Sequence, residues 1–379
     1  MLSPLLLAVL LQGAPAAPAP TTVPSPAAGT GAQAALPPGT IAIAQMRIEA
    51  AMAKLGVPGL AVAVVAREQL VWSAAFGEAD VENEVPVRTD TMFRLASVSK
   101  PITATAVLQL VERGRLDLDA PVQRYVPAFP EKPWPVTPRL LLAHLAGVRH
   151  YEEGEFGSTR RYVSLTEALQ IFAAGPLAHE PGTRFLYTSY GYNLLGCAVE
   201  GASGQSFLDY VRANVFEPAG MFSARDDDAL ALIPHRAQGY TKSASGELRN
   251  SALADTSNKV PGGGLCATVE DVARFTMALQ GGVLLSRESL GRMLTRQKTR
   301  EGKPVGYGLG FFLTERDGVK EAWHTGGQQR VSNVLYLQPD RRIGVILLTN
   351  LEGIGPQLTD LARELATVVT RPEEVSRRH

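Results

Sequence analysis

Ser97 and Lys100 are the residues whose types and spacing most directly suggest chemistry. They stand three positions apart at the start of an apolar, helix-like run, so their side chains share one helix face about one turn apart. The ammonium of Lys100 can therefore reach the hydroxyl of Ser97. Apolar neighbours at Ile102, Ala104 and Val107 would desolvate that ammonium and lower its pKa, so that Lys100 could act as a base toward Ser97. The competing interpretation is an ordinary helix start with Ser97 as N-cap and Lys100 in water.

A second pair of hydroxyl groups, Tyr187 and Ser189, lies where a turn at Pro181–Gly182 leads into another helix-like run. Tyr187 could pass a proton between a nucleophile and a leaving group if a nearby cation lowered its pKa. The competing interpretation is a packing tyrosine whose hydroxyl is hydrogen-bonded within the protein.

The third candidate segment is His324-Thr325-Gly326-Gly327, at the end of a strand-like run. Glycines allow a substrate to come close to the backbone edge of a strand. One N–H group there could complete an oxyanion hole. His324 alone is equally compatible with a structural role.

The composition excludes several classes of function. The chain has 379 residues, with 37 Lys plus Arg balanced by 37 Asp plus Glu, so no basic surface for nucleic acid is expected. Its cysteines, Cys197 and Cys266, match no zinc-ligand spacing, and we expect both to be free and buried, with a single bridge left open. No G-x-S-x-G elbow, H-E-x-x-H helix or phosphate-binding loop occurs, which disfavours an α/β-hydrolase, a zincin and a P-loop enzyme. The sequence implies no metal or organic cofactor.

The chain ends read as segments outside the folded part. The apolar run Leu2–Leu11 followed by Ala14-Pro15-Ala16 predicts a signal peptide over residues 1–16 and an exported, periplasmic or secreted protein, although a low-complexity tail is the alternative. That run is about half as long as a membrane-spanning helix, so no stable membrane span is expected. Residues 17–38 read as an Ala/Pro-rich linker and residues 371–379 as a tail.

Between these ends, apolar periodicity places strands near both termini and helices in the middle. The predicted helices are Ile41–Leu55, Ser97–Glu112, Thr137–Ala146, Ser164–Ala173, Tyr190–Glu200, Ser206–Val215 and Gln357–Val369. The predicted strands are Leu60–Val65, Leu70–Phe76, Tyr307–Glu315, Glu321–His324, Val331–Leu337 and Ile343–Thr349, with a last hairpin turn at Pro339-Asp340.

This order predicts an α+β fold. One antiparallel sheet would be built from both chain ends and flanked by helices, and a mostly helical domain would be inserted into it. We expect the sheet domain to comprise residues 39–90 and 285–370, and the helical domain residues 91–284.

Taken together, the three candidate segments resemble the penicillin-recognising serine hydrolases, in the class C-like branch of serine beta-lactamases and D-alanyl-D-alanine peptidases. The resemblance extends from about Ile41 to Leu365. It includes Leu116-Asp117-Leu118-Asp119, Leu141-Leu142-Ala143-His144-Leu145-Ala146-Gly147 and Gly262-Gly263-Gly264. The segments Gln123–Lys132, Gly147–Tyr151 and Phe185–Tyr187 look most similar to the mitochondrial serine beta-lactamase-like proteins of this superfamily.

The resemblance implies a beta-lactamase-like fold and a role for each candidate residue. Ser97 would attack a carbonyl, Lys100 and Tyr187 would manage the proton, and the N–H groups of Ser97 and Gly327 would form the oxyanion hole. The residues expected to contact substrate are Ser189, His324, Thr325 and Gly326.

Two residues depart from the motifs of that superfamily. Ser189 stands where Asn is usual, and His324 stands where a Lys usually helps to fix a substrate carboxylate. A histidine is mostly neutral at neutral pH, so beta-lactam and D-Ala-terminal substrates are less favoured. Arg330 could supply a substitute charge, although a solvated strand-end arginine is the competing interpretation.

Three further positions invite a functional interpretation. We expect His144 to be a hydrogen-bonded core residue and the run Asp226-Asp227-Asp228 to be a solvated loop. Cys266, after the glycine run, is a candidate reactive thiol.

The sequence therefore predicts a serine hydrolase that cleaves an amide or ester of a small molecule or peptide through an acyl-enzyme on Ser97. Peptidase, beta-lactamase and esterase activities stay open, as does the oligomeric state. The alternative of another class is a binding or self-assembling protein that has kept the fold without turnover.

Overall fold

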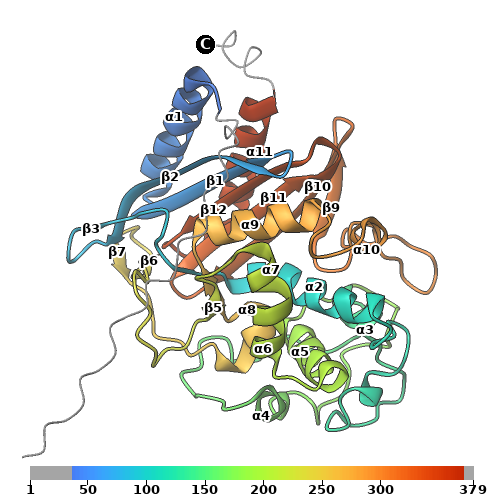
Figure 1. Cartoon of the computed structure of the whole chain (residues 1–379). Helices are drawn as coiled ribbons and strands as arrows, with labels where there is room; N and C mark the ends of the chain where they lie inside the picture. Colours follow the sequence, from blue (N-terminus) through green and yellow to red (C-terminus); the bar gives the residue numbers. More distant parts are fainter. Residues whose placement is uncertain (1–35, 371–379) are drawn as a thin grey trace, which may run out of the picture. The chain divides into compact units, whose positions relative to one another are not determined.

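A seven-stranded antiparallel sheet forms the centre of the structure. The computed structural model describes residues 36–370 (Figure 1), so the predicted signal peptide and tail, and all but the last three residues of the predicted linker, lie outside the described residues. The strands follow the order β3-β2-β1-β12-β11-β10-β9. Their bounds are Gly59–Ala66 (β1), Gln69–Asp80 (β2), Val85–Pro86 (β3), Phe312–Arg316 (β9), Val319–Gln328 (β10), Val331–Gln338 (β11) and Ile343–Thr349 (β12).

The two chain ends meet in the middle of this sheet. β1 pairs along its length with β12, from Leu60 opposite Thr349 to Ala66 opposite Ile343. Both strands are nearly continuous apolar runs, because both faces of the sheet are covered. Alternate residues of β1 therefore enter two different hydrophobic cores, one containing Leu60 and the other Ala61. The prediction of an α+β fold with a sheet built from both ends is confirmed.

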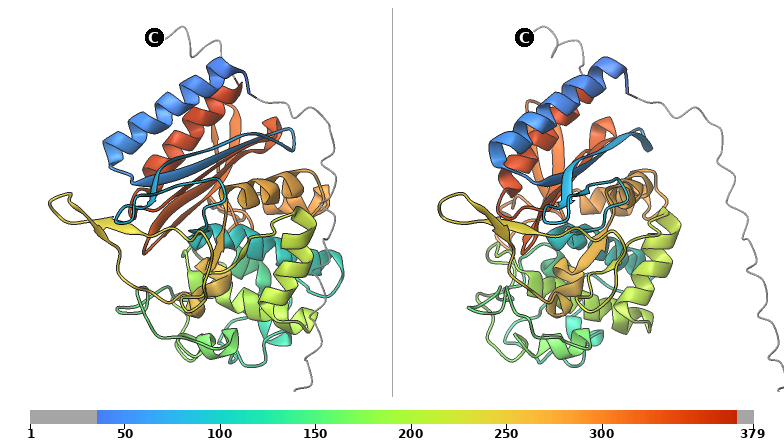
Figure 2. Two further views of the ribbon diagram at one scale, coloured as in Figure 1. Left: turned by 60° about the vertical axis from the view of Figure 1, so that its left-hand side comes forward. Right: turned by 90° about the vertical axis from the view of Figure 1, so that its left-hand side faces the viewer.

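Helices from the two ends of the chain cover one face of the sheet. α1 (Pro38–Leu55) and α11 (Gly355–Thr370) lie side by side over that face (Figure 2). The helix α9 (Val269–Gln280) packs on the opposite face against β1, β2 and β12. The last residue assigned to the linker, Pro38, is the first residue of α1.

The middle of the chain is mostly helical, as predicted. It contains α2 (Ser99–Glu112), α3 (Pro138–Leu142), α4 (Leu165–Leu169), α5 (Ser189–Ser203), α6 (Phe207–Val211), α7 (Glu217–Ala219), α8 (Val260–Gly263) and α10 (Arg287–Met293). Short 3₁₀ turns lie at η1 (Ala96–Val98), η2 (Val122–Arg124), η4 (Ser257–Lys259) and η5 (Pro339–Arg341), and a π-helical turn, η3 (Arg212–Phe216), continues α6. Small sheets pair β4 (Phe93–Arg94), β8 (Leu265–Ala267) and β5 (Arg225–Asp226), and β6 (Tyr240–Lys242) with β7 (Leu248–Asn250).

Some predicted elements differ from the structure. The run Tyr307–Glu315 was expected to be one strand, but β9 begins at Phe312, because Gly310 takes a φ of 104° and passes close to α2. The helix α9 was not predicted, and it packs on the sheet although it falls within the range 91–284. The domain boundaries themselves stay a prediction.

Asn333 on β11 ties this sheet to the segment that carries the candidate nucleophile. Its Nδ2 donates to the carbonyl oxygen of Arg94 at 2.7 Å, and its Oδ1 accepts from the N–H of Thr349 at 3.1 Å. The side chain is fully buried. Both backbone groups would be left without a partner in its absence, because water cannot reach them.

We therefore expect Asn333→Ala to lower the free energy of unfolding by about 2 to 4 kcal/mol, measured by urea denaturation. Asn83→Ala is the matched control, since Asn83 is exposed and hydrogen-bonds only to Asp80; it should change stability by less than about 0.5 kcal/mol. Equal effects of the two substitutions would contradict the role of Asn333.

Candidate active site

Ser97 lies in the tight turn η1 between β4 and α2. The turn depends on Ala96, whose φ is 49°, an uncommon value for a residue with a side chain. β10 packs directly against it: a Cβ on Gly326 would lie 2.2 Å from the carbonyl oxygen of Leu95. Glycine at position 326 therefore allows the strand edge to approach the nucleophile.

The ammonium of Lys100 is completely buried and has three partners. Nζ lies 3.0 Å from Ser97 Oγ, 3.1 Å from Ser189 Oγ and 2.6 Å from the carbonyl oxygen of Gly262. A protonated amine can donate to all three oxygens. A neutral amine can donate to Ser189 and Gly262 and accept the proton of Ser97 with its lone pair. The site therefore accommodates both protonation states of Lys100.

Burial holds the pKa of Lys100 well below the ordinary value of lysine, and the positive charge of Lys259 lowers it further. Within residues 36–370, no carboxylate forms an ion pair with Lys100 to oppose this effect. The direction agrees with the expectation from the apolar neighbours of Lys100. A neutral lysine beside a serine hydroxyl can serve as a general base.

Tyr187 completes the cluster around Ser97. Lys100 Nζ lies 4.9 Å from the centre of the Tyr187 ring, and the phenol lies close enough to Ser97 for the serine hydroxyl to act on its pKa. Burial raises the pKa of Tyr187, an effect that outweighs the influence of Ser97. No cation is among the groups that lower this pKa, so Tyr187 is held as a neutral phenol, which is suited to donating a proton.

His144 packs against the ring of Tyr187. The two rings lie with their centres 4.3 Å apart, and His144 Nδ1 accepts from the N–H of Thr188 at 3.1 Å. Burial lowers the pKa of His144 well below its usual range, so the ring is neutral. The prediction of a hydrogen-bonded core histidine is confirmed.

Ser189 is buried beside Lys100. Its hydroxyl accepts a hydrogen bond from Lys100, and it also acts on the phenol of Tyr151. These contacts allow Ser189 to position Lys100, and its expected contact with a substrate stays a prediction.

His324 also faces the protein interior. Nδ1 donates to the carbonyl oxygen of Thr325 at 2.7 Å, and Nε2 accepts from the hydroxyl of Tyr307 at 3.1 Å. Burial and the charge of Lys100 lower the pKa of His324 to about 3. A neutral ring with both nitrogens engaged cannot replace the missing lysine as a cation for a substrate carboxylate.

The rest of the third segment lines the edge of β10. Thr325 is partly buried near Gly355 at the start of α11, and Gly326 is buried against η1. Gly327 is exposed, and the space that a Cβ on it would occupy is open. The strand β10 contacts η1, the turn that carries Ser97. An oxyanion hole formed by the N–H groups of Ser97 and Gly327 stays a prediction.

Arg330 is half-buried and lies among other charged residues. It lies in the turn between β10 and β11, and the positive charge of Arg94 and the negative charge of Asp227 both act on it. Burial is the main cause that lowers its pKa. Neither interpretation of Arg330, as a substitute cation or as a solvated arginine, matches this half-buried position.

Several residues of the site were not predicted as such. His150 accepts from the N–H of Ser189 at 3.3 Å, and Gln328 donates to the carbonyl oxygen of Gly263 at 3.0 Å. Burial lowers the pKa of His150 to about 4. The motifs Gly147–Tyr151 and Gly262-Gly263-Gly264 pointed to these segments, but the directions of the side chains have no signal in the sequence.

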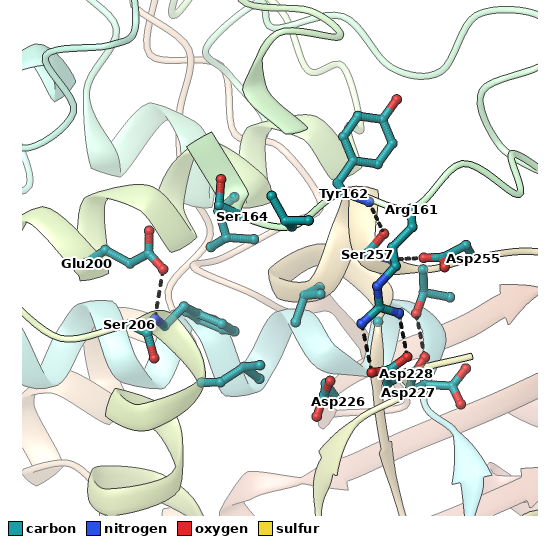
Figure 3. A pocket seen from close by; sticks show the side chains of 17 residues that line it. Arg161, Tyr162, Ser164, Glu200, Ser206, Asp226, Asp227, Asp228, Asp255 and Ser257 are labelled. Carbon is teal, nitrogen blue, oxygen red and sulfur yellow. Dashed lines mark hydrogen bonds and ion pairs between the residues drawn. The ribbon is translucent and has the colours of Figure 1, made fainter. Parts of the chain in front are cut away.

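A separate cavity of about 420 Å³ is lined in part by Val260, the first residue of α8, and by Gly264, which follows that helix; Figure 3 shows its lining. Its wall includes the run Asp226-Asp227-Asp228, which is not the solvated loop that we expected. Asp227 is buried in an ion pair with Arg94, and Asp228 pairs with Arg161. Among residues 36–370 no group of His, Cys, Asp and Glu side chains is arranged to hold a metal ion.

The cysteines are free and buried, as predicted. Burial raises the pKa of Cys266 above its ordinary value, and nearby aspartates add to this effect. A buried thiol that resists ionisation is unreactive, so the proposal of a reactive thiol at Cys266 is wrong. In the part of the chain that the structure describes, no helix is long and apolar enough to cross a bilayer.

The fold, together with the clustering of Ser97, Lys100 and Tyr187, is that of a serine hydrolase. The profile of the Beta-lactamase family matches residues 44–369, and the chain belongs to this family. The resemblance to the penicillin-recognising serine hydrolases is thereby confirmed.

Three relatives illustrate the range of the family. The chain is 29% identical to the Serine beta-lactamase-like protein LACTB, mitochondrial, of Homo sapiens, over 81% of this chain and 76% of that protein. It is 31% identical to Esterase EstB of Burkholderia gladioli, over 80% of this chain and 89% of that protein. The solved penicillin binding protein from Bacillus halodurans aligns with a TM-score of 0.73 and 27% identity, over 84% of this chain and 98% of that chain.

The neutral state of His324 predicts how stability depends on pH. The pKa of His324 is about 3 in the folded protein and near 6.5 in an unfolded chain, so the unfolded state takes up a proton first as the pH falls. This histidine therefore destabilises the fold progressively below pH 6.5, by about 1 to 2 kcal/mol at pH 5.

We expect His324→Gln to flatten the loss of unfolding free energy between pH 7 and pH 5, measured by urea denaturation at several pH values. His235→Gln, at an exposed position, should leave that loss almost unchanged. An unchanged pH dependence in His324→Gln would mean that the histidine is already charged in the folded protein.

Proposed function

We propose that the chain cleaves an amide or ester bond by forming an acyl-enzyme on Ser97, with neutral Lys100 as the general base. The observation that carries this proposal is the position of Lys100 Nζ, 3.0 Å from Ser97 Oγ and hydrogen-bonded to the carbonyl oxygen of Gly262. The oxygen of Gly262 fixes one amine hydrogen, so the lone pair can be directed to Ser97.

In the acylation step Ser97 Oγ forms a bond to the carbonyl carbon while its proton passes to Lys100. The tetrahedral oxyanion would accept hydrogen bonds from the N–H groups of Ser97 and Gly327. The bond to the leaving group then breaks, and Tyr187 gives its proton to the departing nitrogen or oxygen. The proton on Lys100 passes to Tyr187 and restores both groups.

Deacylation repeats these transfers with water as the nucleophile. A water molecule gives a proton to the Tyr187 and Lys100 pair as its oxygen attacks the ester of Ser97, and the same proton returns to Ser97 Oγ when the acid product leaves. Both half-reactions use the same two groups, so the scheme needs no additional carboxylate.

The environment of His324 supports substrates whose recognition does not require a carboxylate next to the strand β10. The ring is neutral and both of its nitrogens have protein partners. This favours esters and amides over beta-lactams and D-Ala-terminal peptides, and the 31% identity to an esterase agrees with it. Peptidase activity is the second candidate, because the resemblance of Gly147–Tyr151 to the mitochondrial relatives favours it.

We also propose that Leu2–Ala16 directs export, on the sequence pattern alone. The mature protein would then act in the periplasm or outside the cell. Expression of the full chain followed by fractionation and intact-mass measurement tests this assignment. Recovery of an uncleaved chain in the cytoplasm would overturn it.

Substitution of the nucleophile and its base tests the proposed reaction. We expect Ser97→Ala and Lys100→Met each to lower kcat/KM by at least about 10³-fold on p-nitrophenyl esters, because the bond-forming oxygen or its base is lost. A fluorescent penicillin and an ester panel, followed by mass spectrometry of the adduct, should label Ser97 alone.

The matched controls are Ser245→Ala and Lys303→Met, at exposed positions, and both should keep full activity. If neither reagent modifies Ser97 and neither is hydrolysed, the protein is a binding or self-assembling member of the family. Rapid hydrolysis of nitrocefin would shift the assignment toward a beta-lactamase.

The role of Tyr187 predicts a dependence on the leaving group. A p-nitrophenolate leaves without being protonated, whereas an amine must receive a proton. Tyr187→Phe should therefore lower the acylation rate with an amide by about 10² to 10⁴-fold and that with a p-nitrophenyl ester much less, measured by single-turnover kinetics. Equal losses on both substrates would contradict proton donation by Tyr187, and Tyr162→Phe serves as control.

A further inference from the structure

Lys259 is a second buried lysine beside the catalytic cluster, and nothing in the reaction described above uses it. Only 1% of its surface is exposed. Its Nζ donates to the carbonyl oxygen of Phe156 at 2.7 Å and lies 4.7 Å from the centre of the Phe156 ring and 5.1 Å from that of Tyr151. This enclosed ammonium cannot reach a substrate, so any effect on the reaction must pass through other groups.

Two short paths connect Lys259 to Lys100. Lys259 stands three positions before Gly262, whose carbonyl oxygen accepts from Lys100 Nζ at 2.6 Å. On the other side, the ammonium faces the ring of Tyr151, and the hydroxyl of Tyr151 is hydrogen-bonded to Ser189, the second partner of Lys100. Each path thus runs from Lys259 to a group that contacts Lys100 directly, Gly262 on one side and Ser189 on the other.

The segment that carries Lys259 is held on both of its faces. Toward the interior, Thr103 Oγ1 donates to the carbonyl oxygen of Pro261 at 2.7 Å. Toward the cavity, Ser257 accepts from the N–H of Tyr162 at 2.8 Å and donates its own N–H to Asp255, also at 2.8 Å (Figure 3). These bonds hold the backbone on both sides of Lys259, and the bond to Phe156 holds its ammonium.

The charges around the two lysines favour one protonation pattern. Burial and the charge of Arg94 lower the pKa of Lys259 to about 7, although Asp255 acts in the opposite direction. Below that pH Lys259 is positive, and its charge disfavours a second positive charge on Lys100. The titratable groups that face the pair are Tyr151, Tyr187 and Tyr192, the neutral rings of His144, His150 and His324, and Arg94 and Asp255 beside Lys259.

We propose that Lys259 is a positioning residue whose buried positive charge keeps Lys100 in the neutral form that accepts the proton of Ser97. The inference rests on the proposed function, because it requires Lys100 to be the base. The alternative is that Lys259 only anchors the loop of residues 152–158 through its bond to Phe156.

Substitutions that separate charge from hydrogen bonding distinguish these two roles. Lys259→Gln keeps a donor for the oxygen of Phe156 and removes the charge, whereas Lys259→Arg keeps the charge. Since kcat/KM falls as Lys100 becomes protonated, we expect Lys259→Gln to move the acidic limb of the pH profile about 0.5 to 1 unit toward higher pH. Lys259→Arg should leave the limb within about 0.2 units of the wild type.

Lys132→Gln is the matched control. Lys132 also binds backbone carbonyl oxygens, those of Ala173 and Gly175, and its replacement should leave the limb in place. An unmoved limb in folded Lys259→Gln, together with activity that still requires Ser97 and Lys100, would overturn the inference and leave the proposed function intact. Activity that requires neither Ser97 nor Lys100 would instead overturn the proposed function.

A second measurement does not depend on activity or on the folding of Lys259→Gln. NMR of the wild-type protein labelled with ¹³C at lysine Cε, with Lys259→Arg and Lys100→Met used for assignment, follows both amines directly. We expect the apparent pKa of Lys259 to lie near 7, and the amine of Lys100 to stay neutral until the pH falls below that value. A Lys259 that titrates like an exposed lysine would overturn the inference.

Discussion

The removal of Lys100 from water is the constraint on which the rest of the site depends. Burying an ammonium group without a carboxylate partner costs free energy. Hydrogen bonds to one backbone oxygen and two hydroxyl groups offset part of this cost, and the lowered pKa of Lys100 allows the amine to become neutral. Each of these partners comes from a different part of the chain. The turn η1 and the helices α5 and α8 must therefore come together around one amine for Ser97 to act as the proposed nucleophile.

The contact between η1 and β10 positions the edge of β10 relative to Ser97. Gly326 permits a backbone contact that any side chain would block. The buried amide of Gln328 joins β10 to α8, and that of Asn333 joins β11 to β4, each by a hydrogen bond to a backbone carbonyl oxygen. Such bonds are directional, so they restrict the positions of the segments around η1 more than apolar packing alone would. The geometry proposed for the oxyanion hole would thus be set before a substrate arrives.

The sequence predicts the parts of this protein that depend on local patterns. The i, i+3 spacing of Ser97 and Lys100 and the apolar runs of β1 and β12 are local properties, and both led to correct predictions. The helix α9 was not predicted, although Thr268 and Asp271 form a capping box at its start.

The parts that could not be predicted depend on which way a side chain points. His324 faces inward because Tyr307, in a stretch expected to be a strand, provides a partner for its ring. Lys259 looks like any solvated lysine in the sequence, and its burial depends on Phe156, which is 103 positions away. Contacts of this kind arise only from the assembled fold, so no spacing rule reveals them.

The pairing of β1 with β12 also has a consequence for how the protein is made. Gly59 donates its N–H to Asn350, 291 positions further along the chain. The strands β1 and β12 can therefore pair only after the residues between them have been synthesised. Until β12 has been synthesised, the edge of β1 that faces away from β2 has no partner strand, although the helical middle of the chain is already complete. The exposed edge of β1 allows incomplete copies of the chain to pair with one another and aggregate. A chaperone that covers the hairpin of β1 and β2 until β12 emerges would prevent such pairing.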